Sequence, residues 1–407
     1  MADQKITVMV TIHGIGFQQT PAPGVEGYAD GLHQHLYELI PDLLGGDTDP
    51  QHGRTSQSGP IYVHSHWPPE SRDAEEGLSR LGRWRLDEKG HRVIDTSQAK
   101  PLQDGDKKIA HVALVYAHLE DQGGHIGAAL ETSIDALFAL PRYTSLGGLI
   151  TSAVTDLKAI LGHHDQPNKG EPTPSLQVRQ DSPTHDVVAG EKGTKQEKNP
   201  SGLLAVVKQL EQDIATYVIR NDLRERVRSF VYDALIRICS RDEVEKVIVN
   251  AHSQGTVVAY DVLRALPPFA AEKIACLVTN GSPLRKYVSL FYWGADAGCL
   301  SQVRWENLWD DKDPVADPLV PGEKWKRGAP YPEHDEFSVL YYALDASSGE
   351  FSKVRIRDTQ VDNVTNSAGS GLVAHNYWDN KKDVIPLLAG VLKEAVSEAK
   401  MPEVVEL

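Results

Sequence analysis

The stretch from Val244 to Leu266 constrains the fold more than any other part of the sequence. Val244 to Asn250 is predicted to be a strand, and Thr256 to Leu266 is predicted to be a helix that ends at Pro267-Pro268. Between them, Ala251-His252-Ser253-Gln254-Gly255 leaves room only for a sharp turn. A strand joined to a helix in this way is the repeating unit of α/β folds with a largely parallel sheet.

The same alternation of strand and helix runs through the chain. Ile6 to Ile12 is a nearly continuous β-branched run, typical of a strand buried on both faces, and it ends in His13-Gly14-Ile15-Gly16. Apolar residues at helical spacing follow between Tyr28 and Leu44. Further strands are expected at 61–66, 109–116, 274–280, 303–309 and 354–357, and helices within 202–240 and 384–400. The sequence therefore predicts an α/β protein with a mostly parallel, doubly wound sheet flanked by helices.

Two insertions are expected within what we interpret as one domain over residues 1–407. Residues 69–106 are polar and irregular, and residues 126–240 form a longer insertion. Within it, 126–161 is apolar and helical, so it could form a cap over a pocket or simply pack on the sheet. Residues 162–200 are rich in Pro, Gly, Lys, Gln and Asp, which predicts a flexible polar loop that cannot bury enough surface to order itself.

Charge and cysteine content narrow the class of protein. Lys and Arg number 42 against 57 Asp and Glu, a net charge of −15, which argues against nucleic-acid binding. Three cysteines cannot all pair within one chain, so reduced thiols in a cytoplasmic protein are expected. No apolar run is long enough for a transmembrane segment. Transient contact with a membrane or lipid remains compatible with the sequence, and the oligomeric state stays open.

Ser253 is the candidate nucleophile. A nucleophile elbow holds its serine on a strained strand-to-helix turn and needs small residues two before and two after it, because backbone segments approach closely there. Ala251 and Gly255 satisfy this need, although Ala251 departs from the G-x-S-x-G pattern. The alternative is a serine that is merely buried or that caps the following helix.

A general base for this serine is expected downstream of it. A serine hydroxyl is a weak nucleophile and needs a base that an acid orients, in the chain order serine, acid, histidine. Only His334 and His375 follow Ser253. His375 lies after the last predicted strand, in a glycine-rich loop followed by aromatic residues, and is our candidate base. His334 lies in a charged, proline-rich stretch and is expected on the surface.

The acid is expected after the strand at 303–309. Asp310, Asp311, Asp313 and Asp317 all qualify by position. Asp313 precedes Pro314-Val315, a turn that would fix a carboxylate at the end of the strand, so Asp313 is our candidate and Asp310 is the next choice. The acidic cluster lacks the spacing of an EF-hand, and no metal site is predicted.

Two backbone amides are the candidate oxyanion donors. The amide of Gln254 directly follows the nucleophile at a helix N-terminus. The amide of Ile15 lies in the glycine-containing turn after the first strand, which could also be an ordinary turn that ends a strand.

Together these motifs resemble the α/β-hydrolase superfamily, on its lipase and esterase side. The matching residues are H-G-I-G at 13–16, A-H-S-Q-G at 251–255, D-P-V at 313–315 and H-N-Y-W at 375–378, with N-G-S-P at 280–283 similar to the turn after the next strand. The resemblance covers the first ~65 residues and the chain from ~240 onward by motif order. It implies the α/β-hydrolase fold, a Ser-His-Asp triad, a covalent acyl-enzyme and no cofactor.

The substrate class is left open by this resemblance, because the fold hosts many chemistries. The sequence predicts a hydrolase of carboxylic esters, either lipid esters or small acyl esters. A phospholipase or a thioesterase of the same fold remains an alternative, as does a catalytically inactive scaffold. Tyr287, Phe291, Tyr292 and Trp293 could flank an acyl pocket or belong to the ordinary core.

Overall fold

The structure is a computed structural model of the 407-residue chain. It describes residues 5–14, 21, 25–47, 59–65, 73–116, 217, 221–291, 294–313, 315–321, 330–331, 334–344, 348–367 and 373–397.

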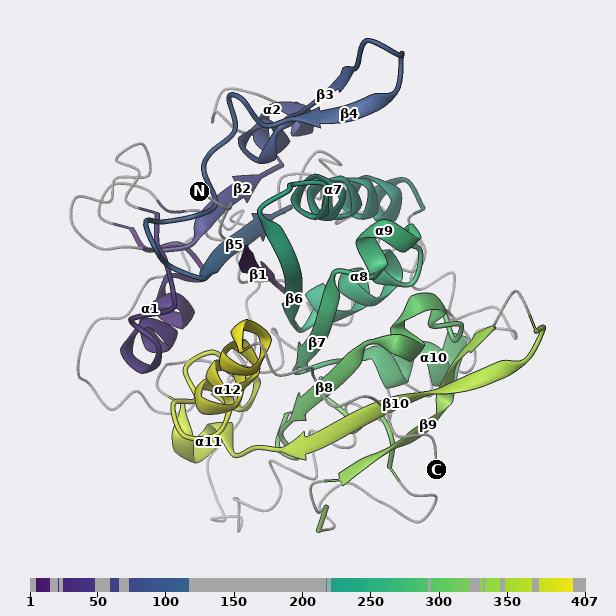
Figure 1. Ribbon diagram of the computed structural model, residues 1–407. Coiled ribbons are helices and arrows are strands. Elements are labelled where there is room, and N and C mark those ends of the chain that lie inside the picture. Colours follow the sequence, from purple (N-terminus) through teal and green to yellow (C-terminus); the bar gives the residue numbers. More distant parts are fainter. Residues whose placement is uncertain are drawn as a thin grey trace, which may run out of the picture.

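A single eight-stranded sheet forms the centre of the described part (Figure 1). In spatial order its strands are β2 (Ile61–His64), β5 (Ile109–Val115), β1 (Ile6–Ile12), β6 (Val244–His252), β7 (Ile274–Asn280), β8 (Arg304–Trp309), β10 (Phe351–Gln360) and β9 (His334–Leu344). Neighbouring strands pair in parallel throughout, except that β9 is antiparallel to β10. The predicted α/β architecture with a mostly parallel sheet is confirmed.

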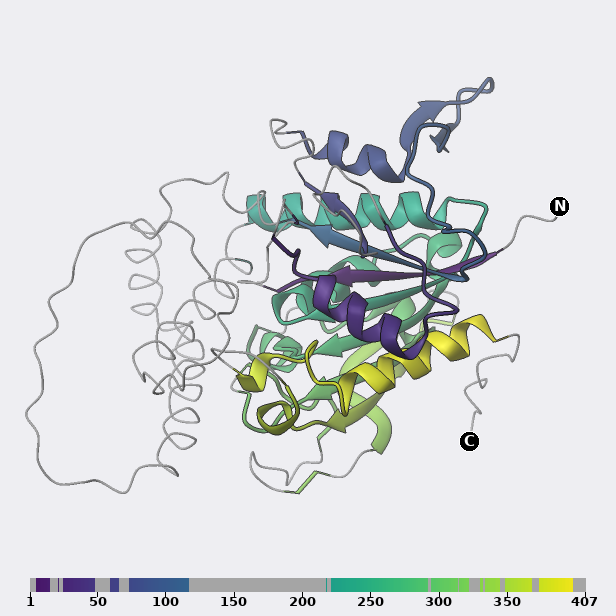
Figure 2. The ribbon, with the colours of Figure 1, turned by 90° about the vertical axis from the view of Figure 1, so that its left-hand side faces the viewer.

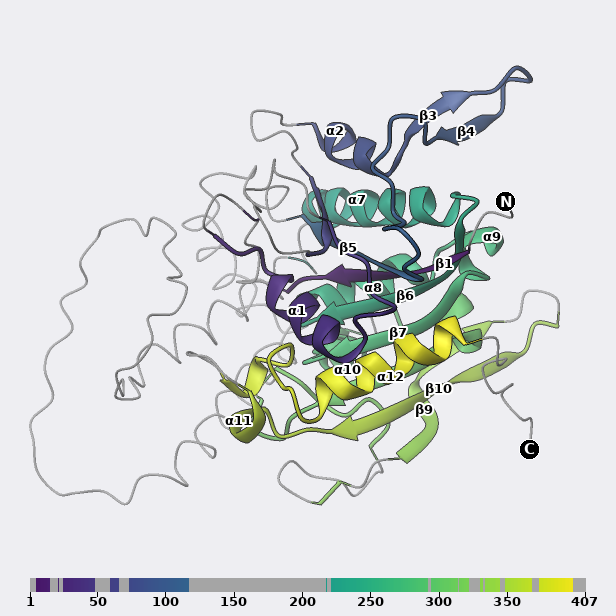
Figure 3. The same cartoon turned by 60° about the vertical axis from the view of Figure 1, so that its left-hand side comes forward.

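Helices cover both faces of this sheet, as Figures 2 and 3 show. On one face lie α7 (Asn221–Cys239), α8 (Gln254–Leu263), α9 (Pro268–Ala271) and α10 (Leu284–Phe291). On the other lie α1 (Asp30–Leu39) and α12 (Val384–Val396), which pack against each other. Shorter elements are α2 (Ala74–Leu78), α11 (Asn363–Asn366) and the 3-10 turns η2 (Ser79–Leu81), η4 (Gly298–Gln302) and η5 (Val373–His375).

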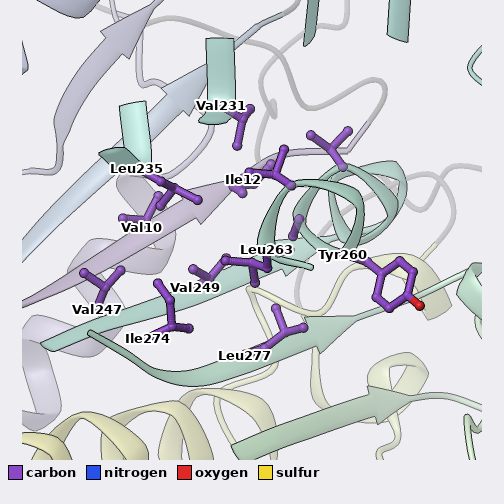
Figure 4. Packing of buried hydrophobic residues seen from close by; sticks show 14 of the residues in the cluster. Val10, Ile12, Val231, Leu235, Val247, Val249, Tyr260, Leu263, Ile274 and Leu277 are labelled. Atoms are coloured by element: carbon purple, nitrogen blue, oxygen red, sulfur yellow. The ribbon is translucent and has the colours of Figure 1, made fainter. Parts of the chain in front are cut away.

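The alternation of side chains along β1 explains why this strand lies deep in the sheet. Val10 and Ile12 belong to the core that the sheet forms with α7 and α8, whereas Met9 belongs to the core beneath α1 and α12. Figure 4 shows Val10 and Ile12 beside Leu235 of α7. A parallel strand covered on both faces needs a nearly continuous run of apolar and β-branched residues, which is the pattern of its sequence.

The parallel arrangement brings the candidate site residues to one edge of the sheet. β1 leads into His13-Gly14, β6 leads into Ser253, and β8 leads into the loop of Asp313. From β1 the chain proceeds to β2 and β5 on one side of β1 and later to β6 on the other side. Crevices beyond the carboxyl ends of strands at such a reversal are the usual binding sites of open α/β sheets.

Residues 69–106 contain more regular structure than their polar sequence indicates. The described part of this insertion, from residue 73, holds α2, η2 and a hairpin of β3 (Arg83–Leu86) and β4 (Arg92–Asp95) that projects from the body (Figures 1 and 3). Its base is tied to α7, because Trp84 Nε1 donates to Asp233 (2.8 Å) and the buried Arg237 donates to the carbonyl of Gly82. These long-range polar contacts leave no periodic signal in the sequence.

Strand β9 was also not predicted from the sequence. His334, which we expected in a surface loop, is the first residue of this strand. The strand is irregular, since its register against β10 shifts and the hydroxyl of Ser338 accepts hydrogen bonds from the amides of Leu340 and Tyr341. A bulge of this kind breaks the period-2 alternation that identifies a strand in a sequence.

Several predictions fall on residues that the structure does not describe. The predicted helical region 126–161 and the predicted polar loop 162–200 both lie outside the described residues. Within 202–240, a helix is confirmed over α7, whose apolar face packs in the main core, whereas residues 202–216 and 218–220 lie outside the described residues.

Two findings concern the predictions of no transmembrane segment and of reduced cysteine thiols. No helix in the described part of the chain combines the length and apolar character that a membrane crossing requires. All three cysteines are described and free, with Cys239 and Cys276 buried and Cys299 partly exposed.

We predict that Leu235→Ala lowers the free energy of unfolding by about 2–5 kcal/mol, because Leu235 is fully buried and its removal leaves a cavity beside β1. The matched control is Leu86→Ala on the projecting hairpin, where the leucine is 65 % exposed and the change should stay within about 0.5 kcal/mol. Urea unfolding of both variants measures the difference. Equal effects would contradict the assignment of the core to the β1–α7 layer.

Candidate active site

Ser253 lies in a strained turn between β6 and α8. Its φ is 54° and its ψ is −129°, and it has the only positive φ among the described residues other than glycine. Such a conformation costs on the order of 1–3 kcal/mol and persists only where the surroundings enforce it. The amide of Ser253 donates to the carbonyl of Asn280 (2.9 Å), and its side chain makes no capping hydrogen bond to α8. The structure therefore gives no support to the helix-capping alternative.

Two glycines allow this turn to pack against the end of β1. A Cβ on Gly255 would lie 2.4 Å from the carbonyl oxygen of His13 and 2.6 Å from that of Ile12. A Cβ on Gly14 would lie 2.3 Å from Ser253 Cβ and 3.0 Å from its Oγ. The glycine two residues after the serine is thus required by close backbone approach, and the backbone of Gly14 lies against the candidate nucleophile.

His375 and Asp313 form a buried pair. His375 Nδ1 lies 2.7 Å from Asp313 Oδ2, and the two side chains are 4 % and 0 % exposed. The other carboxylate oxygen, Oδ1, accepts from the amide of Val315 (2.9 Å), and Oδ2 also accepts from the hydroxyl of Tyr377 (3.0 Å). An ionised carboxylate only accepts hydrogen bonds, so Nδ1 of a neutral His375 carries the proton and Nε2 keeps its lone pair.

Asp313 is held in its ionised form. Burial raises the pKa of this carboxyl, but the charge of His375 and the hydrogen bonds from His375, Val315 and Tyr377 outweigh burial, and the pKa lies below its ordinary value. A buried charge with all of these donors can orient an imidazole and stabilise its protonated form.

The other acidic candidates have different partners. Asp310 accepts from the amides of Lys312 (2.8 Å) and Asn363 (2.7 Å), and these bonds connect the loop after β8 to α11. Burial raises the pKa of Asp310 to about 6, partly offset by these two bonds. Asp317 pairs with Lys286. Among the described contacts of the four acids, only that of Asp313 reaches the ring of His375.

Gly281 brings the segment that carries His375, here called the base loop, close to the turn that carries Ser253, here called the nucleophile turn. It follows Asn280, whose carbonyl accepts from the amide of Ser253, and its φ is 63°. A Cβ at this position would lie 2.9 Å from His375 Cε1 and would be strained by the positive φ. Ser253 Oγ and His375 Nε2 are both buried and have no hydrogen-bond partner among the described residues. Proton transfer from serine to histidine needs these two atoms.

His252 connects the nucleophile turn to the base loop. Its ring centroid lies 4.6 Å from that of His375, and its Nε2 donates to the backbone carbonyl of His375 (2.9 Å). Burial, followed by the nearby charge of His375, lowers the pKa of His252 to about 3, so the ring is neutral near pH 7. The sequence indicated no function for this residue.

The candidate oxyanion donors are placed unequally. Gln254 is the first residue of α8, so its amide has no intrahelical acceptor, and its side-chain Oε1 accepts from the hydroxyl of Tyr287 (2.9 Å). The amide of Ile15 lies outside the described residues. The turn after β1, just before Ile15, is fixed by His13, whose Nε2 accepts from the amide of Tyr116 (3.2 Å). The proton of this imidazole is therefore on Nδ1, which donates to the carbonyl of Gly14 (2.8 Å).

The described residues contain no cluster of three or more His, Cys, Asp or Glu side chains with the geometry of a metal site. No family model, curated protein or solved structure matches this chain.

For two residues near the site, Tyr377 and His252, the sequence predicted no contact with the candidate acid or base. Tyr377 bonds to the candidate acid, and His252 bonds to the backbone of the candidate base. Both lie inside motifs that the sequence singled out, H-N-Y-W and A-H-S-Q-G, but only the folded arrangement shows which atoms they contact.

We predict that Gly255→Ala lowers the free energy of unfolding by about 1–3 kcal/mol, because its Cβ would collide with the backbone of β1. The matched control is Gly390→Ala inside α12, where an added Cβ meets nothing within 4 Å and the change should stabilise by about 0.5–1 kcal/mol. Denaturant unfolding of the two variants gives the comparison. A Gly255→Ala variant as stable as the parent would contradict the close packing of the elbow on β1.

Proposed function

We propose that this chain is a serine hydrolase of the α/β-hydrolase type that cleaves carboxylic esters. Ser253 is the nucleophile, His375 the general base and Asp313 the acid that orients the base. The observation that carries the proposal is the presence, at the same edge of the sheet, of a strained serine and of a buried histidine whose Nδ1 is held by a carboxylate. Strain at a non-glycine residue and a buried charge are kept together most often where chemistry needs them.

Acylation follows from the proton positions in this site. Nε2 of His375 accepts the proton of the Ser253 hydroxyl while Oγ attacks the ester carbonyl. Asp313 stabilises the imidazolium that forms, because it remains ionised when buried. The amide of Gln254, at the positive end of α8, donates to the developing oxyanion. Collapse of the tetrahedral intermediate breaks the ester C–O bond, and the imidazolium gives its proton to the leaving alkoxide.

Deacylation repeats these steps with water. His375 removes a proton from a water molecule, the hydroxide attacks the acyl carbonyl, and the bond to Ser253 Oγ breaks as Oγ takes the proton back. The products are a carboxylic acid and the regenerated hydroxyl. No step needs a metal or an organic cofactor. The amide of Ile15 remains our proposed second donor to the oxyanion.

A catalytically inactive scaffold would require neither the strain nor the buried charge of this site. A protein that had abandoned catalysis would have no reason to retain strain at Ser253 together with a fully hydrogen-bonded Asp313. A phospholipase or thioesterase would use the same residues and differ in the shape of the acyl and leaving-group sites.

We expect Ser253→Ala to abolish turnover of p-nitrophenyl esters and Asp313→Asn to lower kcat by about 10⁴-fold, because the asparagine favours the wrong tautomer of His375. Asp310→Asn is the matched control, since Asp310 ties the loop without contacting the base, and it should retain most activity. Steady-state rates over esters of graded acyl length check all three variants.

Equal losses in Asp310→Asn and Asp313→Asn would contradict the choice of acid. Undiminished turnover in Ser253→Ala would contradict the nucleophile. A rate that rises with acyl length favours a lipase, whereas a preference for short chains favours a soluble esterase.

A further inference from the structure

We propose that Tyr377 is a positioning residue of this site, which holds the acid Asp313 through its hydroxyl and tunes the basicity of His375. This inference rests on the proposed hydrolase function. It assigns to the H-N-Y-W segment a second role besides supplying the base.

The direction of the Tyr377 hydrogen bond is fixed by its neighbours. The hydroxyl oxygen accepts from the backbone amide of Asp310 (2.9 Å), and an amide can only donate. The phenolic proton is therefore free to donate to Asp313 Oδ2, 3.0 Å away. Burial raises the pKa of Tyr377 well above its ordinary value, so the hydroxyl keeps this proton.

Tyr377 and His375 compete for the same carboxylate oxygen. Oδ2 accepts from both the Nδ1 of His375 and the hydroxyl of Tyr377, while Oδ1 is occupied by the amide of Val315. A donor that shares the charge of Oδ2 weakens its pull on the imidazolium. It also prevents the carboxylate from rotating away from His375, because three donors define its plane.

The position of the ring is set by the strand ends around it. Tyr377 is fully buried, and a Cβ on Gly281 would lie 2.8 Å from its Cε2. Its ring also packs near His252 at the end of β6, with centroids 5.9 Å apart. Among the described titratable groups, His252 from β6, Asp310 from the loop after β8 and Tyr377 itself lie near His375 and Asp313, and His13 from the end of β1 lies near His252.

The test is the rate at which a fluorophosphonate labels the full-length protein, measured from pH 5 to 9. We expect Tyr377→Phe to lower the plateau rate by roughly 10- to 100-fold, the range for loss of one hydrogen bond to a charged group. The midpoint of the pH profile should move upward, because Oδ2 then attracts the imidazolium more strongly. A purely structural role would lower the amount of active protein without moving this midpoint.

Tyr341→Phe is the matched control. Tyr341 is also a fully buried tyrosine, but it lies on β9 and its hydroxyl has no partner among the described residues, so labelling should match the parent. In the Asp313→Asn background, Tyr377→Phe should change the rate by less than about 3-fold, because its partner is already lost.

Three results would overturn the inference: an unmoved or lowered midpoint, a parental rate in Tyr377→Phe, or a full additive loss in the double variant. Failure of the proposed function gives a different result, since the parent itself would then resist labelling at Ser253. The thermal unfolding midpoints of Tyr377→Phe and of the parent distinguish a loss of folded protein from a loss of reactivity. The double variant is compared with Asp313→Asn on folded protein only.

Discussion

The parallel pairing of β1 with β6 is the constraint on which the site depends. Its register places Ile12 opposite Ala251, so the turn after β1 and the turn after β6 leave the sheet at the same level. Gly14 and Gly255 then permit contact that any side chain would block. Pairing of β6 with β7 and of β7 with β8 extends this edge to the loops that carry Gly281 and Asp313.

Strain and buried charge in the site are supported by the surrounding packing. Ser253 keeps an unfavourable backbone conformation while β6 and α8, on either side of it, are almost wholly buried. The charge of Asp313 is compatible with full burial because three hydrogen-bond donors surround it. Both features are local departures from the most stable arrangement, and the extensive core of the sheet and its helices can sustain them.

How much could be predicted from the sequence varied with the range of the interactions involved. Strands such as β1 and helices such as α8 follow from local patterns, and the order of the site motifs identified Ser253, Asp313 and His375 as candidates. The irregular strand β9 and the projecting hairpin depend on a bulge and on contacts with distant Arg237, which have no local signature. The hydrogen bond of Tyr377 to Asp313 joins residues 64 positions apart, so only the folded structure shows it.

The proposed activation of Ser253 as a nucleophile is tested most directly by the site of covalent modification. Full-length protein treated with a fluorophosphonate should gain the mass of one adduct, and peptide mapping should place that adduct on Ser253. Prior denaturation should prevent the reaction, because activation requires the folded Asp313–His375 pair. No adduct on the folded protein, or an adduct that maps to another serine, would contradict the account.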